Sequence, residues 1–202
     1  MKPLLTPAIG GCSDIRRFLL IAGAAAIASL SAPVVLTAGD APDADVNVRE
    51  DHGVYTVRAA FEVPQPAEIA FAVLTDYEAI PRFMPNISSS VVLERENGRV
   101  VVEQQAVSRL MMFSKRLHLV LDIEEGAGTL TFSDRCRRSF ARYEGEWRLS
   151  ERNGRTLIIY ELLAQPTFDV PEFVLRRVLK RDSRELIARV KREIAARPTL
   201  RS

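Results

Sequence analysis

PEFVLRRVLKRDSRELIARVKREIAAR, residues 171–197, is the longest regular pattern in this chain of 202 residues. Apolar residues recur in it at spacings of three and four, from Leu175 and Val178 to Val190 and Ile194, which is typical of one amphipathic helix. Pro171 suits the first position of a helix, because an N–H there would have no partner within the helix. The pattern therefore predicts a long helix near the C-terminus, with one apolar face to bury.

Six segments in which apolar and polar residues alternate precede this helix, and turn residues separate them. Asn97-Gly98 and Asn153-Gly154 are strong hairpin signals, and a third turn falls at residues 125–128. Leu117 and Leu119 share one strand face, while His118 lies on the other and is predicted to face solvent. The predicted strands span residues 89–95, 99–107, 115–124, 129–134, 140–150 and 155–164.

A further strand and two short helices are predicted upstream, at residues 54–63, 66–74 and 76–83. The order is therefore strand, two short helices, six strands and a long helix, which excludes a doubly wound α/β fold. We expect an α+β protein in which a curved antiparallel sheet of about seven strands wraps around the C-terminal helix.

The first 38 residues differ from the rest of the chain. Residues 18–38 carry no charge, and Lys2, Arg16 and Arg17 precede them, as in an export signal. The two adjacent arginines are compatible with the twin-arginine route. The sequence predicts a signal peptide at 1–38 and export to a bacterial periplasm, with a membrane anchor at 18–38 as the alternative. Residues 39–49 are predicted as a linker and 50–197 as one domain.

Charge is unevenly distributed along the chain. The formal net charge is +2, but residues 39–170 carry a net charge of −6 and residues 171–197 one of +5. A basic amphipathic helix favours docking to an anionic membrane surface, and the alternative is a solvated face with internal ion pairs. Nucleic acid is not expected as a partner. The candidate docking residues are Arg176, Arg177, Lys180, Arg181 and Arg184.

Several short sequence motifs resemble those of one known superfamily. They are LTDYE (74–78), IP (80–81), FMPN (83–86), EQ (103–104), YEGEW (143–147), TLIIYE (156–161), PTFDVP (166–171) and LKRD (179–182). The pattern resembles the START-related superfamily (Bet v 1-like, SRPBCC), in its polyketide cyclase/dehydrase and coenzyme Q-binding branch. The resemblance implies a helix-grip fold with a cavity between sheet and helix for a lipid, quinone or polyketide-like ligand.

Candidate cavity residues follow from strand parity and from the proline-bounded segment 77–86, which is either a mouth or a plug. Gln104 interrupts an apolar strand, so it is either a polar anchor for a ligand or a satisfied core amide. Tyr143 and Trp147 share a strand face and suit either a cavity or ordinary core packing. The candidates are Tyr77, Phe83, Met84, Gln104, Leu117, Leu119, Tyr143, Trp147, Tyr160, Phe173 and Val174.

Catalytic and metal-binding motifs are not found, so no catalytic residue, metal or cofactor is predicted. The first hypothesis is an exported binding or carrier protein for a hydrophobic small molecule. The second is an aromatase/cyclase-like enzyme, with Glu103, Tyr143 and Glu161 as acid–base candidates. A third is a ligand-free interaction module. The sequence leaves the oligomeric state open.

Overall fold

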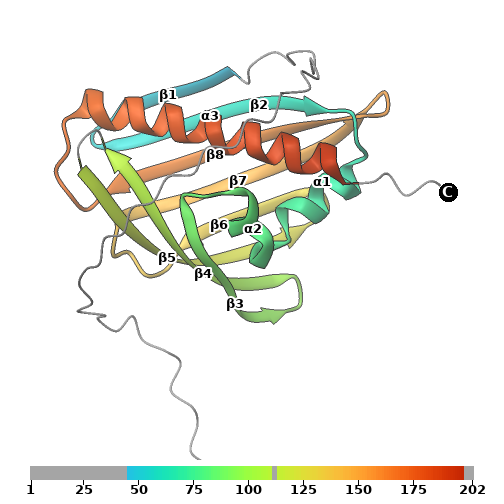
Figure 1. Ribbon diagram of the computed structural model, residues 1–202, viewed down its shortest axis with the longest axis horizontal. Coiled ribbons are helices and arrows are strands. Elements are labelled where there is room, and N and C mark those ends of the chain that lie inside the picture. The colour runs from blue at the N-terminus through green and yellow to red at the C-terminus, as the bar shows by residue number, and fades with distance from the viewer. Residues whose placement is uncertain (1–44, 111–112, 198–202) are drawn as a thin grey trace, which may run out of the picture. The chain divides into compact units, whose positions relative to one another are not determined.

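Eight strands form one antiparallel sheet, in the order β1-β2-β8-β7-β6-β5-β4-β3 (Figure 1). The computed structural model describes residues 45–110 and 113–197. The predicted signal or anchor (1–38) and the predicted linker up to residue 44 lie outside the described residues. The strands are β1 (Asp45–Asp51), β2 (Val54–Val63), β3 (Ile87–Glu96), β4 (Arg99–Leu110), β5 (Phe113–Gly126), β6 (Thr129–Asp134), β7 (Phe140–Arg152) and β8 (Arg155–Pro166).

The helices lie where the sequence predicts them. Between β2 and β3 the chain forms α1 (Ala67–Leu74), the 3₁₀ turn η1 (Tyr77–Ala79) and α2 (Ile80–Phe83). After β8 comes the long helix α3 (Glu172–Ala196), which crosses the sheet (Figure 1). This arrangement is the helix-grip fold, and the predicted α+β class is confirmed.

Tight turns fix the register of the hairpins. Asn97-Gly98 and Asn153-Gly154 both have positive φ at the two turn residues, as a two-residue hairpin loop requires. His52-Gly53 has the same geometry between β1 and β2, and the sequence reasoning missed it.

β1 corrects two predictions, because it makes the sheet eight-stranded and includes residues 45–49 of the predicted 39–49 linker. Its alternation rests on Val46 and Val48, which are 0% and 9% exposed, between polar residues that face outward. Two valines in an acidic segment are too weak a periodic signal to predict a strand.

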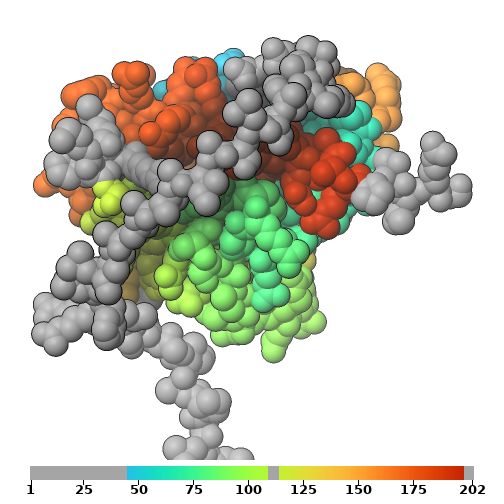
Figure 2. Space-filling model, viewed as in Figure 1, coloured from blue at the N-terminus to red at the C-terminus, as the bar shows by residue number. Residues whose placement is uncertain are grey.

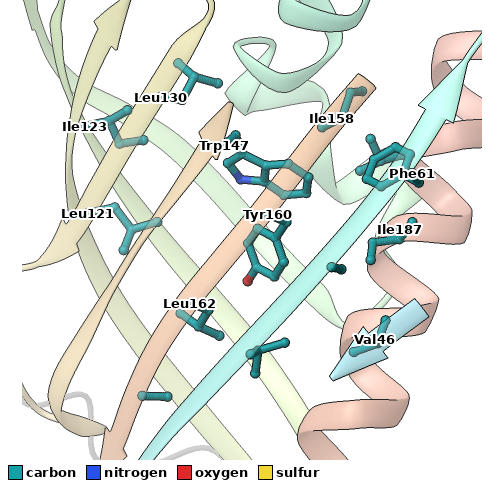
Figure 3. Close-up of a cluster of buried hydrophobic side chains, with 14 of the residues drawn as sticks. Val46, Phe61, Leu121, Ile123, Leu130, Trp147, Ile158, Tyr160, Leu162 and Ile187 are labelled. Atoms are coloured by element: carbon teal, nitrogen blue, oxygen red, sulfur yellow. The ribbon is translucent and has the colours of Figure 1, made fainter. Parts of the chain in front are cut away.

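The inner face of the sheet and the apolar face of α3 form the core. Ile158 of β8 and Ile187 and Ile194 of α3 are among the most completely buried side chains. Ile187 belongs to the same cluster as Val46 and Phe61, and Figure 3 shows it on the side of α3 that faces them. One edge of the apolar face of α3 is therefore packed against the β1–β2 end of the sheet.

Gly145, in the middle of β7, lets the backbone of β8 and the ring of Phe132 lie closer to β7 than any side chain at this position would permit. A Cβ atom built there would collide with the carbonyl oxygen of Glu161 on β8 and would lie 2.5 Å from Cζ of Phe132 on β6. The backbone oxygen cannot move without disturbing the β7–β8 pairing.

We therefore expect Gly145→Ala to lower the free energy of unfolding by about 1–3 kcal/mol, the range typical of overpacked sites. Urea unfolding would measure it. Ser150→Ala, at an exposed position of the same strand, is the control and should change stability by less than about 0.5 kcal/mol. Equal stability of Gly145→Ala and the wild type would contradict the close approach.

Candidate functional site

An apolar cavity of about 260 Å³ lies between the sheet and α3. Its walls come from strands β3 to β8, from the segment between α1 and β3, and from α3. Leucine, valine, isoleucine and phenylalanine predominate in the lining. Protein interiors have few voids larger than a water molecule, so a hollow of this size is an unusual feature of a core.

Nine of the eleven predicted cavity residues lie in this lining. Strand parity placed the strand residues correctly, because alternate side chains of a strand share a face. The nine are Tyr77, Phe83, Met84, Gln104, Leu117, Leu119, Tyr143, Trp147 and Tyr160.

Phe173 and Val174 do not line the cavity, and their predicted placement is wrong. Phe173 is 73% exposed, whereas Leu175, Val178 and Leu179 line the cavity. Two residues along a helix correspond to a rotation of about 200°, so Phe173 points almost opposite to Leu175. An apolar residue in the first turn does not reveal which face of the helix is buried.

Aromatic rings from three neighbouring strands make up one wall. The rings of Trp147 (β7) and Tyr160 (β8) have centroids 4.4 Å apart, and Figure 3 shows them side by side. Tyr143 lies between Phe140, at 4.9 Å, and Phe132, at 6.0 Å. This wall offers flat apolar surfaces to a ligand.

Gln104 is a buried amide with a protein partner. It is 8% exposed, and its Nε2 donates to Oγ of Ser90 at 3.2 Å. Gln104 also borders the cavity. Because its amide already has a protein partner, the contact favours a satisfied core amide over a polar anchor for a ligand.

The segment 77–86 closes one side of the cavity and packs as a plug. Tyr77 and Met84 are buried, and the Tyr77 hydroxyl donates to Oε1 of Glu125 at 2.9 Å. A guanidinium N–H of Arg189 on α3 donates to the carbonyl oxygen of Phe83 at 3.2 Å, which ties the plug to the long helix. Asn86 also lines the cavity, and its Oδ1 is buried with no partner in the described structure.

Five polar residues of the lining were not predicted from the sequence: Asn86, Ser108, Lys115, Asp182 and Ser183. The Ser108 hydroxyl donates to Oδ2 of Asp182 at 3.4 Å. Nζ of Lys115 lies 5.0 Å from the ring centroid of Phe168. Lys115 is exposed and Asp182 half-buried, so these charges border the solvent. Ser108 lies on the same face of its strand as Gln104, and this shared face was the one sequence signal that could have placed it in the lining.

The two acidic catalytic candidates do not reach the cavity. Glu103 Oε1 lies 2.8 Å from Nε2 of His118 on the outer face of the sheet, where Cys136 Sγ lies 3.7 Å from Nδ1 of the same histidine. Glu161 accepts from Arg148 at 3.1 Å. Tyr143 alone of the three acid–base candidates lines the cavity. Within residues 45–110 and 113–197, no group of His, Cys, Asp or Glu side chains could hold a metal ion.

The arrangement defines a class of fold, in which a curved sheet grips a long helix around an apolar cavity, and small-molecule sites usually lie in such cavities. The family model described as polyketide cyclase/dehydrase and lipid transport matches residues 63–191. The chain belongs to this family. No protein with curated annotation matches the sequence significantly.

Solved structures share the fold at low sequence identity. A Thermus thermophilus protein is 21% identical with a TM-score of 0.60, over 70% of this chain and 97% of that one. The Zhui aromatase/cyclase of a Streptomyces species is 16% identical with a TM-score of 0.59, over 70% and 94%. A STAR-related lipid transfer protein of Xanthomonas axonopodis is 16% identical with a TM-score of 0.60, over 78% and 97%.

Burial shifts the pKa of every tyrosine in the protein. It raises the pKa of Tyr143 to about 12, with smaller contributions from Asp134 and Asp182, and it raises the pKa of Tyr160 well above its ordinary value. Burial also raises the pKa of Tyr77, together with its hydrogen bond to Glu125, and the pKa of Tyr55. These are the four tyrosines of the chain.

We therefore expect the native protein to resist phenolate formation at a pH where the unfolded chain, with tyrosine pKa values of about 10, ionises fully. Ultraviolet absorbance titration of native and guanidinium-unfolded protein tests this. Because the folded pKa values are raised, this contribution to stability is intact below about pH 10 and is lost as the pH rises above it. Coincident native and unfolded titration curves would contradict the burial of these hydroxyls.

Proposed function

We propose that the protein binds and carries a hydrophobic small molecule in the cavity between the sheet and α3. The observation that carries this proposal is the 260 Å³ hollow lined mainly by apolar and aromatic side chains. Membership of a family that includes lipid transport supports it. An unfilled space of this kind forfeits dispersion contacts, which an apolar ligand restores.

Catalysis is the second candidate function and has weaker support. The fold is shared with an aromatase/cyclase, but Glu103 and Glu161 are engaged outside the cavity. Tyr143 remains as the one acid–base candidate that a bound polyketide-type substrate could touch. The ligand-free interaction module is disfavoured, because its core would be closed.

The size of the cavity restricts the ligand. Small-molecule pockets typically enclose about 300–1,000 Å³, so 260 Å³ lies just below that range. A compact lipid, quinone or polyketide-like ring compound fits this space better than a phospholipid with two chains.

Export is part of the same proposal. The uncharged segment 18–38 behind Arg16 and Arg17 supports a signal peptide or an anchor and delivery to a bacterial periplasm. Among the described residues, no helix is long and apolar enough to cross a membrane.

The outward face of α3 supports docking to an anionic membrane. Its ion pairs reduce the number of predicted docking residues that are available for this contact. Arg176 pairs with Glu172 at 3.4 Å and Arg181 with Asp182 at 2.7 Å, as the solvated-face alternative expects. The remaining candidates, Arg177, Lys180 and Arg184, are exposed, and within the described part of the chain no carboxylate lies within 4 Å of them.

Phe173 lies four residues before Arg177, so the exposed ring and the three cations share one helical stripe. In Figure 2, α3 forms part of the molecular surface. An exposed aromatic ring beside cations that lack ion pairs suits the interface of an anionic bilayer. The docking stripe, as we define it, is Phe173, Arg177, Lys180 and Arg184.

Blocking the cavity tests the binding proposal. Ala106→Phe adds a ring at a cavity-lining position of β4, and we expect it to weaken binding of the apolar dye N-phenyl-1-naphthylamine at least tenfold. Ala141→Phe makes the same change at an exposed position and should leave binding unchanged. Dye fluorescence and quenching of Trp147, the single tryptophan, would measure affinity. Native mass spectrometry would detect a co-purified ligand, and no binding by the wild-type protein would refute the proposal.

Removing the docking stripe charges tests the membrane proposal. We expect Arg177→Gln, Lys180→Gln and Arg184→Gln together to reduce partitioning onto vesicles of phosphatidylcholine and phosphatidylglycerol roughly 100-fold, at about 1 kcal/mol per cation. The control combines Arg116→Gln, Arg138→Gln and Arg152→Gln, which removes the same charge from exposed positions outside α3. Equal losses for both triple variants would indicate a net-charge effect and contradict a specific docking face.

A further inference from the structure

Two tyrosine hydroxyls of the cavity wall have no hydrogen-bond partner in the described structure. Tyr160 is 3% exposed, and neither its hydroxyl nor that of Tyr143 bonds to any described residue, whereas the Tyr77 hydroxyl donates to Glu125. Buried tyrosine hydroxyls usually find a partner, because an unmade hydrogen bond costs free energy. The two open hydroxyls therefore need an explanation.

The hydroxyls open onto the cavity and are not enclosed by protein. The buried side-chain oxygens that lack both accessible surface and a partner are those of Gln65 and Asn86, and the tyrosine oxygens are not among them. Tyr143 and Tyr160 both line the cavity, on neighbouring strands of the sheet. Figure 3 shows the Tyr160 hydroxyl pointing away from the indole of Trp147. Both donors therefore belong to the wall of one cavity.

The charged side chains that act on Tyr143 are acidic, because Asp134 and Asp182 both contribute to its raised pKa. The charged residues of the lining are Lys115 and Asp182, and both border the solvent. The raised pKa values of Tyr143 and Tyr160 keep both hydroxyls protonated at neutral pH, so each can donate a hydrogen bond. A buried anion would lack a counter-charge at this depth, whereas a neutral acceptor needs none.

We propose that Tyr143 and Tyr160 form an oxygen-binding subsite that selects a neutral, planar ring compound bearing carbonyl oxygens. This inference rests on the proposed function, since it assigns the ligand class of the same cavity. The rings of Trp147, Phe132 and Phe140 supply flat contact surfaces, and the two hydroxyls donate to the carbonyl oxygens. Saturated chains gain nothing from the hydroxyls, and anionic head groups are disfavoured at this depth.

Three probes of one ring skeleton test the subsite: menadione, which carries two carbonyls, methylnaphthalene, which carries none, and the anion naphthoate. Equilibrium dialysis with full-length protein stripped of ligand would give the affinities. We expect Tyr143→Phe and Tyr160→Phe each to weaken menadione binding by about threefold to tenfold, the effect of one hydrogen bond. Methylnaphthalene affinity should stay within twofold, and naphthoate should bind more weakly than menadione to the wild type.

Tyr55→Phe is the matched control, because Tyr55 is buried but lies outside the cavity lining, and it should leave all affinities unchanged. Loss of menadione and methylnaphthalene binding in parallel, or no loss at all, would overturn the subsite. If the wild-type protein binds none of the probes, the proposed function itself fails.

Thermal unfolding of the ligand-free protein gives an independent readout. A hydroxyl without a partner contributes no stability, so we expect Tyr143→Phe and Tyr160→Phe to melt at or above the wild-type temperature. A lower melting temperature would show that the hydroxyl has a structural partner, and this result would also overturn the proposal.

Discussion

The packing of α3 against the concave face of the sheet is the contact on which the rest of the structure depends. α3 is attached along one edge of its apolar face, where Ile187 and Ile194 are completely buried in the main core. The other edge, with Leu179 and Leu186, borders the cavity. A helix held along one edge leaves space under the other without losing its anchorage. The cavity is therefore a consequence of how the helix is held, and Gly145 assists by letting β7 and β8 approach Phe132 closely.

The same helix also has an outer face of a different character. Its ion pairs, such as Arg189 with Glu185, neutralise some of the basic residues, while Arg177, Lys180 and Arg184 form no ion pair with another described residue. Phe173 adds exposed apolar surface at the start of this face. One element therefore both closes the proposed ligand chamber and presents the proposed membrane contact. For a carrier, this arrangement would place the membrane contact and the ligand cavity on opposite sides of the same helix.

Strand positions were predictable where alternation was long, and β2 (Val54–Val63) and β6 (Thr129–Asp134) have the predicted bounds. The inward faces of β5 and β7 were predictable for the same reason, which placed Leu117, Leu119 and Trp147 in the lining. β1 was missed because two valines give little periodicity. Phe173 was misplaced because residue type alone does not define the face of a helix. Lys115 and Asp182 were missed because charged side chains are ordinarily taken as surface, and here they lie where the surface meets the cavity.

Two separate free-energy costs meet at the cavity. The hollow leaves apolar side chains without contacts on one side, and the hydroxyls of Tyr143 and Tyr160 have no acceptor among the described residues. Filling the hollow by larger side chains would remove the first cost, and replacing tyrosine by phenylalanine would remove the second, so neither feature is required by the fold. A single ligand with a flat apolar body and carbonyl oxygens would offset both costs together. Because such a ligand binds the folded state alone, its affinity and the stability of the protein are thermodynamically linked.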